Sequence, residues 1–176
     1  MATLNNTLDS IERHVGFSRS RSTGVARRLQ EAGLLPSGAP GVAPDLDEDN
    51  VLDLVVALAS DTELHNAVDA VRAFHAMTPG GVSLIGAPQS IPNAPIAVSI
   101  LVEDARAGVA EARKSQIEIS QNACALAIHK PIGQVVRFCM LGQDVTHWPS
   151  RGHHKSITLN VAAMADALDD IFGDNK

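Results

Sequence analysis

Aromatic residues are scarce in this chain: they make up 3% of its 176 residues, with one Trp and no Tyr. Proteins that bind single-stranded nucleic acid stack the bases on aromatic side chains, so this composition argues against such a surface. Cysteine is scarce too, since the sequence has only Cys124 and Cys139, without a Cys-x-x-Cys motif. Two cysteines are too few for a disulfide framework. We expect both to be small buried residues of a sheet, with redox sensing as the alternative.

The sequence also lacks a long apolar run. Its longest apolar stretch, near Val51–Ala59, is interrupted by Asp53 and is too short to span a membrane. The N-terminus is polar and has no apolar signal core. We therefore expect a soluble cytoplasmic protein that has no membrane partner.

Enzyme signatures are absent from the sequence. There is no Gly-x-x-x-x-Gly-Lys phosphate loop, no nucleophile elbow and no pair of spaced zinc ligands. Gly80, Gly81 and Gly86 lack a strand-to-helix context, so they do not form a dinucleotide-binding fingerprint. We therefore expect no enzymatic activity, no cofactor and no metal site.

Hydrophobic residues make up 45% of the chain, which is enough for a packed core. The formal net charge is −6, but residues 1–40 contain five Arg and three acids, a net of +2, and the remainder carries −8. Binding through phosphate neutralisation depends on local rather than total charge. The uneven charge indicates a basic binding face at the N-terminus beside an acidic second part.

The basic N-terminal part has the pattern of a helix-turn-helix. Apolar residues at helical spacing predict a first helix over residues 4–15. Gly16 is expected to turn the chain, and a second helix follows from an N-cap at Ser18 or Ser20 to about Ala32. A Gly-Leu-Leu-Pro sequence then ends the second helix.

The second helix carries side chains suited to the DNA major groove, with short polar residues near its start and arginines along it. An Arg can place two donors on a guanine edge or hold a phosphate, and Ser and Thr hydroxyls can do either. Seven residues are predicted to contact double-stranded DNA, all outside the inward face of Val25, Ala26 and Leu29: Arg19, Ser20, Arg21, Ser22, Thr23, Arg27 and Arg28. The alternative is a small helical bundle with solvated arginines.

The N-terminal third resembles winged helix-turn-helix modules of the MerR type. In those modules an apolar helix, a glycine turn and a second helix are followed by Gly-Leu-Leu-Pro, a loop and another amphipathic helix. The matching stretches here are residues 8–15, Gly16, residues 21–32, 33–36 and 50–59. The loop over residues 36–44 is then a small wing or a plain connection.

The resemblance implies a protein that binds double-stranded DNA. A homodimer or ring is expected, because one helix-turn-helix buries little surface on DNA and specific affinity usually comes from paired half-sites. Phage small terminase subunits also use such modules, so a transcriptional regulator and a DNA-packaging subunit both remain open. The family's usual spacing from the turn glycine places an apolar residue near position 22, where this chain has Ser22. The family's tandem Tyr and its effector-binding residues have no counterpart here.

The predicted fold class is α+β. Residues 1–60 form a helical helix-turn-helix domain, with or without a wing, and residues 61–176 form an α+β domain with an antiparallel β-meander. The second domain is expected to serve oligomerisation or partner contact. Strands are predicted at Ile96–Val102, Gln116–Ser120, Ala123–Lys130 and Gln134–Leu141, with a short one at Val82–Ile85. The stretch Glu103–Lys114 fits a helix or an exposed strand pair.

The best hairpin signal is Lys130-Pro-Ile-Gly133, which fits a type I turn. A symmetrical register around it would place Ile128 opposite Val135 and Cys124 opposite Cys139. A final helix is predicted to begin after an N-cap at Thr158.

The polar stretch 142–156 contains a possible second phosphate-binding patch formed by Arg151, His153, His154 and Lys155. A solvated loop is the alternative, and adjacent histidines rarely aim at one metal ion. From a different class of function, the chain could be a protein-binding adaptor that uses its acidic second part and has no DNA role.

Overall fold

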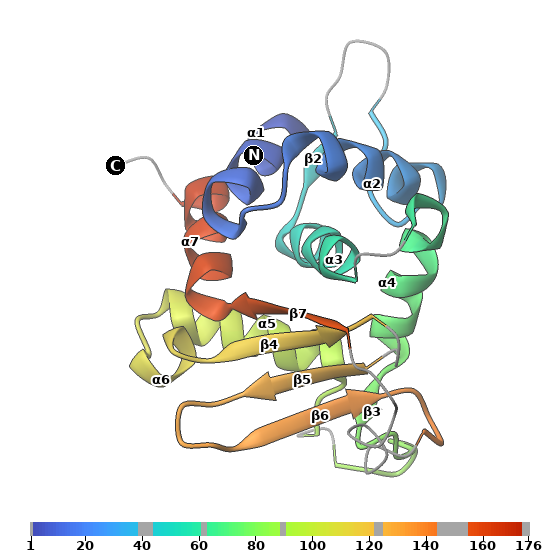
Figure 1. The fold of residues 1–176 in the computed structure, drawn as a ribbon, viewed down its shortest axis with the longest axis vertical. Coiled ribbons are helices and arrows are strands. Elements are labelled where there is room, and N and C mark those ends of the chain that lie inside the picture. The colour runs from blue at the N-terminus through green and yellow to red at the C-terminus, as the bar shows by residue number, and fades with distance from the viewer. Residues whose placement is uncertain are drawn as a thin grey trace.

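The N-terminal helices form one end of the molecule, and a five-stranded antiparallel sheet with two further helices beside it forms the other (Figure 1). The coordinates are a computed structural model, which describes residues 2–38, 44–60, 63–88, 91–121, 125–143 and 155–173. The predicted α+β class is confirmed, with N-terminal helices, then the sheet, then a C-terminal helix. Within these described ranges, no helix is both long enough and apolar enough to cross a membrane.

The first helical segment begins after a short strand, β1 (Ala2–Thr3). It consists of α1 (Leu4–Ser10) and a π-helical continuation, η1 (Ile11–Val15), which together confirm the helix predicted over residues 4–15. Gly16 ends η1 with φ +90°, a left-handed conformation that glycine adopts without strain. The chain then enters α2 (Arg19–Glu31), with Ser18 at the N-cap position.

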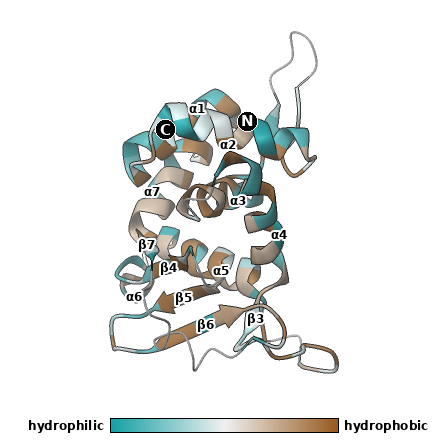
Figure 2. Ribbon diagram, turned by 45° about the vertical axis from the view of Figure 1, so that its right-hand side comes forward, coloured by the Kyte–Doolittle hydropathy of each residue, from teal (hydrophilic) through white to brown (hydrophobic). Residues whose placement is uncertain are grey.

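The third helix lies at the centre of the helical end. Strand β2 (Asp45–Leu46) pairs with β1 and leads into α3 (Glu48–Ala59), where Asp47 and Asn50 form a reciprocal capping box. Every residue from 51 to 59 of α3 is buried. Helices that are apolar on all sides lie inside a protein, and α3 is brown along most of its length in Figure 2.

A short 3-10 turn, η2 (Leu64–Asn66), precedes α4 (Ala67–Ala76) and the two-residue strand β3 (Thr78–Pro79). The strand predicted at Val82–Ile85 is wrong, because these residues form loop and turn after β3. The next helices are α5 (Ala94–Arg106) and α6 (Ala110–Arg113), so the ambiguous stretch Glu103–Lys114 is largely helical.

The strand predicted at Ile96–Val102 is also wrong, because this segment belongs to α5. The side chain of Asn93 caps the helix by accepting a hydrogen bond from the Ile96 amide at 3.2 Å, and Pro95 lies in the first turn. The buried residues recur at helical rather than alternating spacing: Ala94, Val98, Leu101, Val102 and Ala105. Capping and burial on one helical face thus outweigh the strand preference of the β-branched residues.

The main sheet has the strand order β3-β6-β5-β4-β7. Strands β4 (Gln116–Ser120), β5 (Ala125–His129) and β6 (Val135–Cys139) confirm three predicted strands and form the antiparallel meander. The fifth strand, β7 (Ser156–Asn160), was not predicted. Thr158 lies inside β7, so its predicted role as a helix cap is wrong, and Asn160 precedes α7 (Val161–Phe172) instead.

The predicted register of the β5–β6 hairpin is wrong by one residue, because Ile128 pairs with Val136 and Cys139 with Ala125. The expected bond from the Gly133 amide to the Lys130 carbonyl is present at 3.1 Å. Gly133 adds a third loop residue at φ +78°. A type I turn followed by a left-handed residue shifts the register in this way. Cys124, predicted to face Cys139, lies outside the described residues.

One continuous cluster of buried apolar side chains contains residues from both predicted domains, from Leu8 and Val25 to Leu126 and Leu168. Helix α7 returns to the N-terminal end, where the Ser10 hydroxyl donates to the Ala167 carbonyl at 3.1 Å. The predicted division at residue 60 stays a prediction, but the two parts share their core.

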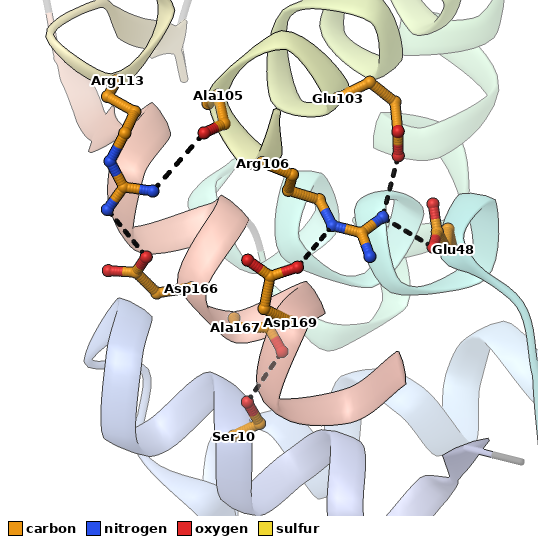
Figure 3. A network of polar contacts seen from close by, with 9 residues as sticks. All are labelled: Ser10, Glu48, Glu103, Ala105, Arg106, Arg113, Asp166, Ala167 and Asp169. Carbon is orange, nitrogen blue, oxygen red and sulfur yellow. Dashed lines mark hydrogen bonds and ion pairs between the residues drawn. The ribbon is translucent and has the colours of Figure 1, made fainter. Parts of the chain in front are cut away.

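Polar contacts also tie the helices together (Figure 3). The Arg106 guanidinium of α5 donates to Glu48 of α3, Glu103 of α5 and Asp169 of α7, at 2.8, 2.9 and 2.8 Å. These carboxylates raise the pKa of Arg106 above its ordinary value. Arg113 of α6 makes a second bond to α7, at 2.8 Å from Asp166.

Candidate nucleic-acid interface

Helix α2 lies at the outer surface of the helical end (Figure 1), with its predicted inward face confirmed. Val25, Ala26 and Leu29 are each no more than 1% exposed. On the opposite side Ser20, Thr23 and Arg27 are exposed at positions i, i+3 and i+7. Residues at this spacing share one face of a helix, so these three form an outward row.

Ser22 does not belong to this row. It is fully buried and lies on the same stripe as Val25, Ala26 and Leu29, so the prediction that it contacts DNA is wrong. Its hydroxyl has no hydrogen-bond partner in the part of the chain that the structure describes. The spacing from Gly16 that is usual in the resembled family indicates an inward position at residue 22, and here it outweighs the polarity of serine.

Arg27 and Arg28 are the most exposed cations of α2, with 79% and 52% of their side chains accessible. Both donate to Glu31 at 2.9 Å. The hydrogen bond from Arg27 is the largest of the contacts that lower the pKa of Glu31, so this carboxylate is ionised at neutral pH. Exposed ion pairs of this kind are weak, so a phosphate or a guanine edge can replace Glu31 as the partner of either arginine.

Arg19 faces α1 instead of lying in the outward row. Its guanidinium forms an ion pair with Asp9 and donates to the Asn5 side chain at 3.1 Å. Its backbone amide donates to the Glu12 carboxylate at 2.9 Å. This bond satisfies one of the amides at the start of α2 that have no partner within the helix. Arg19 therefore holds α2 against α1 in this structure.

Two further predicted residues differ in their surroundings. Thr23 is exposed, but its hydroxyl donates to the Arg19 carbonyl one turn earlier, at 2.8 Å. Arg21 is half-buried.

Most of the predicted second phosphate patch cannot be placed, because Arg151, His153 and His154 lie outside the described residues. Lys155 is exposed directly before β7, and its carbonyl accepts a hydrogen bond from the Gln121 amide at 2.8 Å. Residues 39–43 of the predicted wing likewise lie outside the described ranges.

A second polar site, which the sequence did not reveal, lies in a hollow of about 250 Å3 between α3, α4 and α5. Asp53 of α3 accepts hydrogen bonds from His75 of α4 at 2.8 and 3.0 Å. Burial raises the pKa of Asp53, and the His75 contact opposes this shift. Among the residues with described positions, no three His, Cys, Asp or Glu side chains gather closely enough to hold a metal ion.

Comparisons of the chain with protein-family models, with curated proteins and with solved structures found no match. The interpretation of α2 therefore depends on its own residues and their geometry.

Proposed function

We propose that this protein is a sequence-specific double-stranded DNA-binding protein, and that α2 is the recognition helix of a helix-turn-helix. The observation that carries the proposal is the outward row Ser20, Thr23 and Arg27, with Arg28 beside it, on a helix at one end of the molecule. The B-DNA major groove admits an α-helix, and short hydroxyl side chains allow a close approach to the base edges. We also propose that the protein is cytoplasmic and has no enzymatic activity.

The contacts of each residue suggest a division of roles. Arg27 is exposed enough to reach a base edge or phosphate, and Arg28 can bind the adjacent backbone. Ser20 and Thr23 lie on the same face of α2 as Arg27 and would contact neighbouring bases or phosphates. Arg19 would act indirectly, by holding α2 against α1.

We also propose that the protein acts as a homo-oligomer. One helix-turn-helix buries little surface on DNA, and specific affinity usually comes from paired half-sites. A transcriptional regulator would be a dimer on a short palindrome, whereas a phage-type packaging subunit would form a ring. Light scattering separates these two roles, because a ring has several times the mass of a dimer.

The DNA-binding proposal is tested by removing both exposed arginines. A pool of random-sequence duplexes is enriched on the protein, and the selected duplex is titrated by gel shift at several salt concentrations. The Arg27→Ala/Arg28→Ala double variant should lose at least about tenfold in affinity. The slope of log affinity against log salt should become shallower by about 1 to 2. Each phosphate contact that the variant lacks means that fewer counterions are released when it binds DNA.

Arg137→Ala is the matched control, because Arg137 is an exposed arginine on β6, at the sheet end of the molecule. It should leave affinity and salt slope unchanged. Equal binding by the α2 double variant and the wild type would overturn the proposal. An absence of enrichment by the wild type would favour the adaptor alternative, in which the acidic second part binds another protein.

A further inference from the structure

Gly24 lies in the interior of α2, where glycine is an unfavourable residue. Glycine is less favourable than alanine at such a position, because it loses more backbone freedom when the helix forms. Among the described glycines, only Gly24 lies within a helix, and its φ is outside the left-handed region. The backbone of α2 therefore gives no reason for a glycine at this position.

The packing around Gly24 does not require a glycine either. A Cβ atom on this residue would lie 3.4 and 3.5 Å from the two methyl carbons of Leu64, which belongs to η2. These are ordinary van der Waals distances. An alanine methyl group would therefore fit against Leu64 without a clash.

Gly24 lies on the side of α2 that is proposed to face DNA. It follows Ser20 by four residues and precedes Arg27 by three, so it shares the face of the outward row. Gly24 is half-buried, and Leu64 beside it remains 39% exposed. The outward face of α2 thus has a gap without a side chain, with an apolar group at its edge.

The chemistry of the major groove limits which group can fill this gap. The group has to come close to the backbone of α2, and glycine permits such a close approach. Leu64 offers no hydrogen bond, so its complement is an apolar group. The apolar group that base edges present in the major groove is the methyl group of thymine.

We propose that Gly24 is the point of closest approach between α2 and DNA, and that a thymine methyl group lies there against the Leu64 side chain. This inference rests on the proposed function and adds two residues that determine the preferred DNA sequence. Gly24 and Leu64 carry no charge, so they contribute to the discrimination between bases and not to the attraction of phosphates.

The inference is tested on the duplex that the wild type selects, by replacing each of its thymines with uracil in turn. This change removes only the methyl group. In gel shifts, at least one replacement should weaken wild-type binding by about threefold or more. Leu64→Ala should bind that uracil duplex and the thymine duplex equally well, because the apolar partner of the methyl group is gone.

Substitutions of Gly24 test the close approach itself. Gly24→Leu should weaken binding of the selected duplex at least about tenfold, because its side chain fills the gap. Its binding to random-sequence duplexes should stay unchanged, since that binding depends on phosphate contacts. Ala110→Leu is the matched control, because Ala110 is exposed on α6, at the sheet end of the molecule (Figure 1). It should bind both duplexes like the wild type.

Gly24→Ala separates close approach from a folding defect. It should raise the melting temperature by about 2–4 °C, because alanine is the better helix former, and still lower the affinity for the selected duplex by about threefold. A lower melting temperature would show that the fold itself requires glycine, and the inference would be overturned.

Two further outcomes would overturn the inference: wild-type affinity of Gly24→Leu for the selected duplex, or no effect of uracil at any position. If Gly24→Leu keeps its affinity while Arg27→Ala/Arg28→Ala loses it, only the inference about Gly24 and Leu64 fails and the DNA-binding proposal stands. If the wild type selects no duplex at all, the proposed function fails and this inference fails with it.

Discussion

The Ser22 hydroxyl is buried among the apolar residues of α2 without a partner in the described chain. Replacing this hydroxyl with a hydrogen atom, as in alanine, removes a desolvated polar atom and leaves only a very small cavity. We predict that Ser22→Ala increases the free energy of unfolding by about 1 kcal/mol, measured by urea denaturation. DNA affinity should stay unchanged, because residue 22 does not reach the surface. A large loss of DNA affinity at unchanged stability would contradict this prediction and show that Ser22 contacts DNA.

Asp53 predicts a pH dependence of stability. Burial raises its folded-state pKa above the ordinary value of 3.8, so the folded state favours the protonated carboxyl. As the pH rises from about 4 through the raised pKa, ionisation is easier in the unfolded chain, and the wild type loses stability. Asp53→Asn cannot ionise, so its stability relative to the wild type should increase with pH over this window.

Melting temperatures measured between pH 4 and 7 test this prediction. His75→Ala is the informative companion, because the His75 contact is the largest influence that lowers the pKa of Asp53. Loss of the His75 contact should raise the pKa of Asp53 further, so the pH range over which the wild-type background loses stability should move upward. A wild type that gains stability over Asp53→Asn as the pH rises would show that the His75 contact outweighs burial.

At the scale of elements, Arg106 links α3, α5 and α7 (Figure 3). Its side chain is 19% exposed, and its loss would leave Glu48, Glu103 and Asp169 close together without their shared cation. We predict that Arg106→Met lowers the free energy of unfolding by about 2 kcal/mol, the range for hydrogen bonds to charged groups. Chemical denaturation measures the loss, and added salt should reduce it by screening the carboxylates.

Arg113→Met is the matched control on a neighbouring helix. Arg113 is 38% exposed and forms one ion pair, with Asp166. Exposed single pairs contribute about 0–1 kcal/mol, so this variant should lose clearly less stability than Arg106→Met. Equal losses would mean that packing of the aliphatic stems, rather than the shared cation, stabilises these helices.

The elements show where sequence reasoning succeeds. Periodicity predicts the segment 4–15 and the inward face of α2, because both bury one regular stripe of side chains. Strands β4, β5 and β6 are predicted from short apolar runs between turn signals. The helix α5 is missed because its β-branched residues favour a strand locally, and only the Asn93 cap and the buried face decide otherwise.

Other features depend on contacts that are distant in sequence. Strand β7 pairs with β4 in the register Ile117 to Leu159, some forty residues apart, so no local pattern reveals it. Nor does any motif place Asp53 near His75. For the DNA interface, composition identifies the basic helix, but only the structure separates the outward Arg27 from the α1-facing Arg19.

At the scale of the whole molecule, α7 covers the N-terminal helices. Ile11 of η1 is fully buried, and the Arg13 guanidinium lies 2.9 Å from the Asp170 carboxylate of α7. Residues 51–59 of α3 are buried between α2, α4 and the sheet end of the molecule. A recognition helix that is fixed by such contacts keeps its orientation only while the C-terminal part is folded.

We therefore predict that residues 1–60 do not fold alone. Residues 61–176 include α4, which packs against α3, and α7, which packs against η1, so their removal would expose part of the shared core. A chain of about 60 residues buries only about 60% of the surface of its unfolded state and is marginally stable. Circular dichroism should show reduced helicity and no cooperative melting for the fragment, while the full chain melts cooperatively. Gel shifts with the selected duplex should show only weak, non-specific binding by the fragment. A fragment that melts cooperatively and retains specific binding would contradict this prediction. Residue 60 would then be a true domain boundary, and α7 would not be needed for the N-terminal helices to fold.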